Sequence, residues 1–250
     1  MITRYVFETE EDWKEKRNWV FTASEINRLM ASVSRVMTEN ELIIHKKNNP
    51  KSRTTTIVDP TLLAEGALTY IIEKISAYYD EPKFVYKSFE MEHGTITEPE
   101  AALTLCEILN LNPASDEVIY TSHNGTVFYS DEVIGGTPDL IFPYIKAIAE
   151  IKCPNSQTHL ANKLFLTAEN FEQKYPIYYD QIQTNLYLTE SNLCYFFSFD
   201  PRFKKEYLRT HLIEIKRNEE RINAIIAKSK IAFDYKNQLI EQLENTNKNK

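Results

Sequence analysis

The stretch "GGTPDLIFPYIKAIAEIKCP", residues 135–154, decides the fold of this chain. It holds one acid directly after a proline, Asp139, and it ends in an acid–apolar–lysine triplet, Glu150-Ile151-Lys152. The same triplet occurs a second time as Glu214-Ile215-Lys216, so the triplet alone predicts nothing. Only the residues around Glu150-Ile151-Lys152 can therefore indicate the role of this first triplet.

Side chains alternate between the two faces of a β-strand, so Glu150 and Lys152 share one face, about 7 Å apart along the backbone. Ile151 points to the opposite face, into the core, and its carbonyl stays at the strand edge. A short loop joins the strand of Asp139 to the strand of the triplet, which permits an antiparallel hairpin. In that hairpin Asp139 lies across the ladder from Glu150.

Two neighbouring carboxylates repel each other unless a cation lies between them. Magnesium suits such a place because it takes hard oxygen ligands and keeps several waters, and the Ile151 carbonyl could complete the protein's share. A metal there can activate water and stabilise charge on a phosphate, while Lys152 would orient or deprotonate the water or neutralise the developing oxyanion. The plain alternative is a hairpin with an ordinary Asp–Lys–Glu salt-bridge cluster on its surface.

The composition is that of a soluble globular protein with one large domain or two small ones: 250 residues, 42% hydrophobic and 26% charged. No apolar run is long enough for a transmembrane helix. The start, "MITRYVFETEEDW", lacks the apolar segment of a signal peptide, so we expect a cytoplasmic protein. The three cysteines are far apart, which disfavours a zinc site, an iron–sulfur cluster or a disulfide framework.

Periodicity predicts a mixed α/β domain. The predicted helices cover residues 62–79, 97–110, 178–190 and a segment from 219 onward. In the second of these helices Pro99 lies in the first turn. Short strands are predicted within 118–152, separated by Asn124-Gly125, Gly135-Gly136 and Pro143, and a buried strand over 194–199.

The net charge of -7 argues against general nucleic-acid affinity, but it leaves room for a local basic groove. Residues 34–57 are polar and rich in basic side chains, which favours a mobile basic loop; a solvated surface segment is the alternative. These basic residues are Arg35, Lys46, Lys47, Lys51 and Arg53.

Five stretches, taken together and in order, resemble the lambda-type phage alkaline exonuclease family, also called YqaJ-type viral recombinases, within the PD-(D/E)XK nuclease superfamily. They are "DWKEKRNWVFTASE", "EHGTITEPEA", "YSDEVIGGTPDL" with "AEIKCP", "YYDQIQTNLYLTE" and "FFSFDPRFKKEYL", spanning about residues 12 to 215. The resemblance implies a restriction-endonuclease-like core, a mixed central sheet flanked by helices. We expect a single exonuclease domain over 1–250, with the nuclease core at about 90–200 and a C-terminal helix at about 219–246.

Carried over to this sequence, the resemblance also implies an active site. The metal ligands would be Asp139, Glu150 and the Ile151 carbonyl, with Lys152 as the catalytic lysine. Glu98 would be the acid at the start of an active-site helix, Asp131 an additional acid, and Gln181 a residue that holds the site or the attacking water. The loop before the triplet departs from the family, because it carries Pro143 and Tyr144 where relatives often have a polar glycine turn.

A 5′-terminal phosphate would be bound by Arg17 and Ser24, with Thr137 where some relatives carry serine. The planar fork of an arginine suits a terminal phosphate. Ser24, near a predicted helix start, would add a hydroxyl and backbone N–H groups. For Arg17 alone, a surface salt bridge with Asp12 or Glu15 is the alternative.

The function implied by the resemblance is a magnesium-dependent 5′→3′ exonuclease with two-metal-type hydrolysis, in which manganese could substitute. It would digest one strand of double-stranded DNA from its ends to mononucleotides and leave 3′ overhangs for recombination. The family implies a ring-shaped homotrimer, a single-strand annealing protein as partner and, for a phage-encoded enzyme, the host cytoplasm. Two alternatives stay open: a DNA endonuclease of the same fold, and a non-catalytic DNA-end-binding recombination factor.

Overall fold

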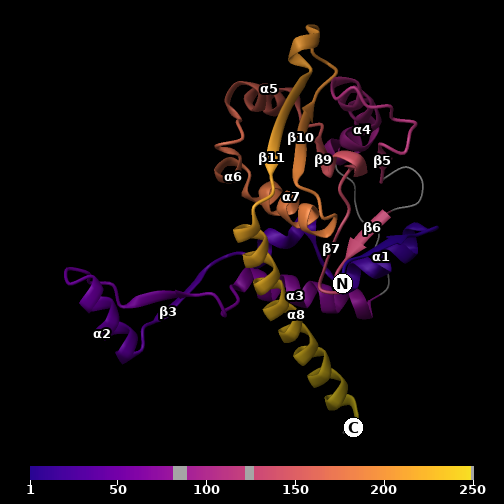
Figure 1. Ribbon diagram of the computed structural model, residues 1–250. Coiled ribbons are helices and arrows are strands. Elements are labelled where there is room, and N and C mark those ends of the chain that lie inside the picture. The colour runs from indigo at the N-terminus through magenta and orange to yellow at the C-terminus, as the bar shows by residue number, and fades with distance from the viewer. Residues whose placement is uncertain (81–88, 122–126, 249–250) are drawn as a thin grey trace.

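A five-stranded sheet forms the centre of the computed structural model, which describes residues 1–80, 89–121 and 127–248 (Figure 1). In sheet order the strands are β11 (Thr210–Lys216), β10 (Leu193–Phe199), β9 (Ala147–Lys152), β8 (Leu140–Phe142) and β5 (Ile119–Tyr120). β9 and β10 run parallel and the other neighbours antiparallel. The expected mixed central sheet is therefore confirmed, while the expected turn at Asn124-Gly125 lies outside the described residues.

Helices cover both faces of this sheet. On one face α4 (Phe89–Ile108) packs on alternate residues of β9, in a cluster that contains Ala101, Leu105, Ala147, Ala149 and Ile151. On the other face α7 (Pro176–Leu188) packs in a cluster that contains Ile148, Ile182 and Leu186. Because β9 is buried on both sides, it needs a nearly continuous apolar run, and its one acid, Glu150, falls on the α7 side.

α4 begins earlier than the sequence predicted. The helix was expected from residue 97 with Pro99 in its first turn, but it starts at Phe89, so that Pro99 lies inside it. A proline removes one helical hydrogen bond and crowds the preceding turn, which is why the sequence favoured a start there. The buried residues that follow, such as Leu105, hold the helix against the sheet and offset this cost. Glu98 consequently lies in the middle of α4.

A second sheet lies at the N-terminal side, in the order β1 (Thr3–Val6), β6 (Val127–Ser130), β7 (Ile134–Gly136) and β2 (Phe21–Thr22). β2 follows α1 (Glu10–Trp19) and leads into a 3₁₀ helix, η1 (Ala23–Leu29). Gly136 lets β7 approach closely, because a Cβ there would lie 2.3 Å from Asn185 Oδ1 and 3.0 Å from Ala23 Cβ. This contact sets β7 directly against η1.

A third core joins η1 to two long helices, α3 (Glu65–Tyr79) and α8 (Glu219–Lys248). Its buried members include Phe21, Ile26, Tyr70, Ile71 and Ile225. α3 starts three residues later than the predicted 62–79 segment, whereas the C-terminal helix begins at Glu219 as expected. The shorter elements that remain are η2 (Pro143–Ile145), α5 (Ser156–Phe165), α6 (Phe171–Lys174) and η3 (Glu206–Leu208).

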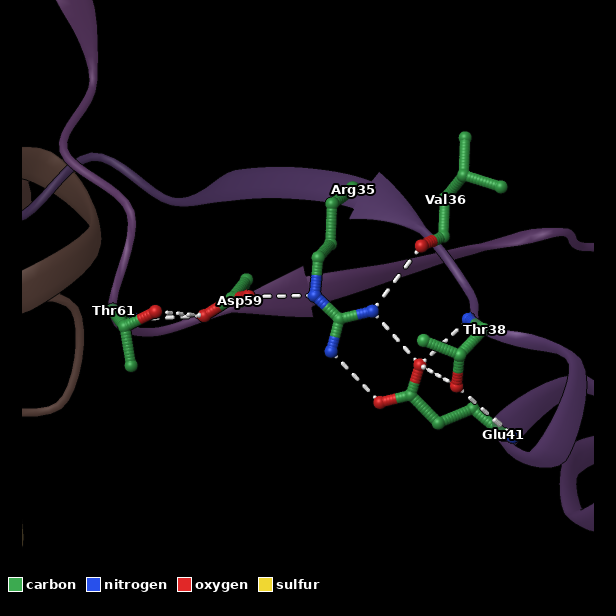
Figure 2. A network of polar contacts seen from close by, with 6 residues as sticks. All are labelled: Arg35, Val36, Thr38, Glu41, Asp59 and Thr61. Carbon is green, nitrogen blue, oxygen red and sulfur yellow. Dashed lines mark hydrogen bonds and ion pairs between the residues drawn. The ribbon is translucent and has the colours of Figure 1, made fainter.

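Residues 33–59 form an ordered arm and not the mobile basic loop that the sequence predicted. β3 (Val33–Val36) pairs antiparallel with β4 (Thr56–Asp59), and α2 (Glu39–Asn48) lies between them in the chain. Figure 1 shows this arm projecting away from the rest of the molecule. Its order has a local cause, which Figure 2 shows at the level of side chains.

Arg35 ties the three parts of the arm together (Figure 2). Its Nε donates to Asp59 Oδ2 over 2.6 Å, and its two terminal nitrogens donate to the Glu41 carboxylate over 2.8 and 2.7 Å. Thr38 and Glu41 also form a capping box at the start of α2. Arg35 therefore serves the fold of the arm, and its charge is matched by two carboxylates.

The outer surface of the arm is both apolar and basic. α2 buries no residue at all. The exposed apolar side chains of the arm are Val36 at 72%, Ile43 and Ile44 at 61%, Ile57 at 40% and Val58 at 56%. Lys46, Lys47, Lys51 and Arg53 are exposed as well. Within the described part of the chain, no helix is long and apolar enough to cross a membrane.

Candidate active site

The hairpin of β8 and β9 has the register that the sequence predicted. Leu140 is opposite Ala149, so the next pair along the ladder is Asp139 and Glu150. The Ile151 N–H donates to Asp139 Oδ2 over 2.6 Å, which fixes the Asp139 carboxylate against β9. The connection is the 3₁₀ turn η2, closed by Lys146 in the left-handed region at φ 48°. This turn, which contains Pro143 and Tyr144, keeps the expected register.

Glu150 is the most buried acid of the site, with 1% of its surface exposed. Its Oε1 accepts from Lys152 Nζ over 2.5 Å and from Gln181 Nε2 over 2.6 Å. Its Oε2 is buried and has no hydrogen-bond partner among the described residues. A buried carboxylate oxygen without a partner is costly, and a divalent cation would satisfy it.

The charged form of Asp139 is also destabilised by its surroundings. Burial, and after it the nearby Glu150 carboxylate, raise the pKa of Asp139 well above its usual range, although Lys152 opposes this. The two acids thus repel each other in the metal-free protein. A hard cation between Asp139, Glu150 and the adjacent Ile151 carbonyl would remove both the repulsion and the missing contact, so these residues fit such an ion.

Lys152 stays charged in this setting. Burial alone would lower its pKa, but the carboxylates of Glu150 and Asp139 raise the pKa of Lys152 above its ordinary value. Its ammonium also lies 5.0 Å from the centre of the Tyr178 ring, a cation–π contact. Of the roles that the sequence left open, this favours neutralising or orienting negative charge over removing a proton from water.

Gln181 is held rigidly against Glu150. The preceding residue, Asp180, is fully buried and accepts from Arg221 Nε and from Asn27 Nδ2, each over 2.6 Å. These bonds tie α7 to α8 and to η1. Gln181 is therefore a residue that positions the Glu150 carboxylate.

Glu98 approaches the site from α4. Tyr120 Oη donates to Glu98 Oε1 over 3.5 Å, and the Glu98 charge contributes to the raised pKa of Asp139. Within residues 1–80, 89–121 and 127–248, however, no three His, Cys, Asp or Glu side chains gather as a metal site. Glu98 thus lies near the two carboxylates without joining them as a third ligand.

Asp131, the additional acid implied by the resemblance, takes part in a turn. It lies at the turn between β6 and β7, where its Oδ1 accepts from the Val133 and Ile134 N–H groups over 3.0 and 2.8 Å. Its Oδ2 accepts from Tyr187 Oη over 2.8 Å. Aspartate commonly closes a turn in this way. The structure thus gives Asp131 a role in the turn, and its part in the active site stays a prediction.

Arg17 lies in the last turn of α1 with its guanidinium 4.2 Å from the centre of the Trp13 ring. In the described part of the chain no carboxylate forms an ion pair with it, and Asp12 instead accepts from Thr9 Oγ1 over 2.7 Å. Burial lowers the pKa of Arg17. A half-buried guanidinium without an ion pair suits an anionic ligand.

Other cations gather around Arg17 and the Tyr70 ring. Lys74 Nζ donates to the Arg17 carbonyl over 2.8 Å and lies 5.5 Å from the centre of the Tyr70 ring, while Arg28 lies 4.5 Å from it. Arg28 is already paired with Glu73 over 2.6 Å. Burial lowers the pKa of Lys74 to about 8. Arg28 is also paired with Glu25 over 2.9 Å, so the cluster around Arg17 holds three basic side chains and two acids.

Ser24 and Thr137 come from adjacent segments. Thr22 is opposite Gly135 in the parallel pair of β2 and β7, and two residues further along the chain Ser24 lies in η1 and Thr137 follows the end of β7. Ser24 is exposed, and its Oγ donates to Thr22 Oγ1 over 3.4 Å. Thr137 Oγ1 donates to the Val127 carbonyl over 2.9 Å. Its hydroxyl proton is thus engaged with the backbone, whereas the contact of the exposed Ser24 hydroxyl with Thr22 is longer and more easily exchanged for a ligand.

The comparisons with known proteins identify the family of the chain and its fold. The family model described as YqaJ-like viral recombinase domain matches residues 12–192. The chain belongs to the YqaJ-like viral recombinase family. No curated protein matches this YqaJ-like chain.

Solved structures share the fold of the YqaJ-like chain. The alkaline exonuclease LHK-Exo of Laribacter hongkongensis, in complex with dAMP, superposes with a TM-score of 0.65 at 20% identity, covering 96% of this chain and 98% of that chain. A phage related exonuclease from Haemophilus somnus 129PT has a TM-score of 0.64 at 15% identity, with 92% and 99% covered. At these identities the likeness establishes the fold.

Two side chains of the YqaJ-like site were not predicted from the sequence. Tyr178 lies one helical turn before Gln181 on α7, so the helix spacing could have placed it beside Lys152. Lys74 lies four residues after Tyr70 on the buried face of α3. A lysine at an apolar helical position is a signal for a buried charge with a specific partner.

Proposed function

We propose that this chain is a magnesium-dependent exonuclease that digests one strand of linear double-stranded DNA from its 5′ ends, releasing mononucleotides and leaving 3′ overhangs. The observation that carries the proposal is the buried Glu150 carboxylate opposite Asp139. One of its oxygens has no partner among the residues that the structure describes, and Lys152 contacts the other. Family membership supports it, as do the exonuclease names of the structural relatives.

Magnesium, or manganese in its place, would bind at Asp139, Glu150 and the Ile151 carbonyl and would stabilise the negative charge that develops on the phosphate, in hydrolysis of the two-metal type. Lys152 adds a fixed positive charge beside that phosphate. Gln181 keeps the Glu150 carboxylate in place, so the site is organised before substrate arrives.

The proposed 5′ polarity rests on the Arg17 guanidinium and the groups around it. A guanidinium that lacks an ion pair, with Lys74 beside it, prefers a doubly charged terminal phosphate over the singly charged internal phosphates. Ser24 supplies a hydroxyl donor at the same place. Such a pocket would hold the 5′ end of the strand while its first bond lies at the carboxylates.

We also propose that the enzyme acts as a homotrimer threaded by its substrate, in the cytoplasm of a host cell and together with a single-strand annealing protein. Cyclic symmetry can enclose DNA even though the chain carries a net charge of -7. The arm of residues 33–59 would supply exposed basic groups to the channel and apolar side chains to a neighbouring subunit. Light scattering that reports one chain mass would refute the trimer.

End-labelled DNA tests the activity. With magnesium and linear duplex, a label at the 5′ end should appear at once as mononucleotide, whereas a label at the 3′ end should remain on long strands until late. A covalently closed circle should stay intact. Cleavage of the circle would favour an endonuclease of the same fold, and binding of ends without any cleavage would favour a non-catalytic end-binding factor.

A further inference from the structure

A hollow of about 340 Å³ lies beside the candidate active site and has no role in the function proposed so far. It is lined by Ser156, Arg202, Phe203, Lys204, Lys205 and Leu208. These residues come from the start of α5 and from the turn between β10 and β11.

The strand register places this hollow close to Lys152. In the parallel pair of β9 and β10, Lys152 is opposite Ser198. Two residues after Lys152 comes Pro154, and two residues after Ser198 comes Asp200. Arg202 bridges these two residues: its Nη2 donates to the Pro154 carbonyl over 3.0 Å and its Nε to Asp200 Oδ1 over 2.7 Å. Two residues of a strand span about 7 Å, so the hollow starts about that far beyond Lys152. The carboxyl ends of parallel strands are a common place for ligands in α/β proteins.

The wall of the hollow is rigid. His159 is fully buried between Ser198 Oγ at 2.9 Å and the Leu208 carbonyl at 2.8 Å, and the Phe203 ring packs on it with centroids 5.6 Å apart. Arg209 Nε donates to the Phe203 carbonyl over 2.8 Å. A ligand would therefore meet a surface that is already formed.

The charge of the hollow is positive. Asp200 is fully buried and its charge is matched by Arg202. Lys204 and Lys205 are exposed and, within the part of the chain that the structure describes, neither ammonium has an ion pair or hydrogen bond. Two unmatched ammonium groups on a rigid surface suit the backbone phosphates of DNA, which are the same for every base sequence.

A second hollow, of about 510 Å³, lies at the other end of β11 and offers a comparison. It is lined by Asn192, Leu193, Glu214, Lys216, Arg217 and Glu219, and Arg217 is paired with Glu219. Two acids offset its two basic residues. The surplus of positive charge thus distinguishes the hollow beside the active site from this second hollow.

We propose that Lys204 and Lys205 bind backbone phosphates of the DNA substrate next to the bond that is cleaved. The proposal rests on the proposed function, because it takes the ligand of this surface to be the DNA on which the exonuclease acts. The two lysines bind and position the DNA and do not touch the reacting atoms. They would keep the strand aligned with Lys152 as each nucleotide is removed.

The test is the salt dependence of DNA binding without cleavage. A duplex oligonucleotide is titrated with the full chain in EDTA at a series of salt concentrations, for wild type and for Lys204→Gln/Lys205→Gln. Each lost phosphate contact reduces the slope of log K against log salt by about 0.9, so the slope should fall by about 2. Both residues are exposed, so the melting temperature should not change.

The matched control is Lys216→Gln/Lys230→Gln, which removes two equally exposed charges elsewhere. This control should keep the wild-type slope. Equal slopes in both double variants would overturn the proposal, because only overall charge would then matter. It would also fail if Lys204→Gln/Lys205→Gln bound duplex normally but bound dAMP more weakly than wild type, which would make the hollow a site for free nucleotide. None of these readouts requires exonuclease activity, so a failure of the proposed function is recognised separately.

Discussion

At the scale of the residue, the two Glu-Ile-Lys triplets show that environment and not composition defines the site. Lys152 contacts the buried Glu150, whereas Lys216 is exposed at the end of the edge strand β11. Lys152→Ala should reduce the cleavage rate by about 10²-fold, the scale of a positioned charge in a reaction centre. Lys216→Ala is the matched control and should cleave normally. Rates measured at saturating DNA check this, and equal losses in both variants would refute the distinction.

Gln181 and Gln183, two residues apart on α7, allow a second comparison within the chain. Gln181 contacts Glu150, but the fully buried Gln183 donates to the Lys216 carbonyl over 2.9 Å and accepts from the Asn218 N–H over 2.8 Å. Gln181→Ala should cost about 10- to 100-fold in activity with a normal melting temperature. Gln183→Ala should lose about 1–3 kcal/mol of stability and keep its rate. Urea unfolding and kinetics on the same two proteins would expose a reversed pattern.

Arg17 is the residue on which 5′ polarity depends. Arg17→Ala should slow digestion of 5′-phosphorylated ends by about 10- to 100-fold, since a charge-assisted bond to the phosphate is lost. Ends with a 5′-hydroxyl should be affected much less. Initial rates on the two substrates give the comparison, and a uniform loss on both would assign Arg17 to stability or to general DNA affinity.

The sequence could place Asp139 opposite Glu150 because strand alternation and a short loop allow few other registers. It could not place Asp131, because a carboxylate that closes a turn and one that belongs to an active site have the same sequence signature. The resemblance favoured the second role. The N–H groups of Val133 and Ile134 donate to its carboxylate, which shows the turn role, while the active-site role stays a prediction.

At the scale of the element, the arm of residues 33–59 depends on one arginine. Arg35→Ala removes the bonds to Glu41 and Asp59, so the arm should open and trypsin should cut it quickly, while the melting temperature of the rest changes little. Arg53→Ala is the matched control, since it also removes one arginine and one trypsin site. Comparable cleavage rates in the two variants would show that Arg35 does not hold the arm.

The same contacts predict how the arm responds to acid. The Arg35 hydrogen bonds lower the pKa of Glu41 to about 2 from 4.5, and those of Thr61, then Arg35, lower the pKa of Asp59 to about 2 from 3.8. A depressed carboxyl pKa stabilises the folded state fully above the unfolded value and less as pH falls. Proteolysis of the arm should therefore be slow above about pH 4.5 and accelerate towards pH 2. An acid-stable protease such as pepsin reports this, with Arg35→Ala insensitive over the same range.

Sequence patterns predicted the elements unevenly. The strand β9 and the helix α7 were predictable because their apolar residues repeat clearly. The start of α4 was not, since Pro99 looks like a first-turn proline until the packing of the later turns is known. The arm was not predictable either, because the order of α2 comes from Arg35 and its two acids and not from a buried face.

At the scale of the whole molecule, the fold class and the family followed from the order of weak motifs along the chain. What the sequence could not provide was the separation of the structure into three cores. It also gave no sign that cations gather at Arg17 and near Lys204 in a chain of net charge -7. Local clusters of charge arise from contacts between distant segments, and a net charge averages over them.

The central claim is that Asp139 and Glu150 hold the metal on which cleavage depends, and Asp139→Asn tests it most directly. The asparagine oxygen can still accept from the Ile151 N–H, so the fold should survive, and the loss of repulsion should leave the metal-free protein at least as stable as wild type. Magnesium should raise the melting temperature of wild type but not of Asp139→Asn, and the variant should leave linear DNA intact. An Asp139→Asn protein that digests linear DNA at the wild-type rate with magnesium would contradict the account.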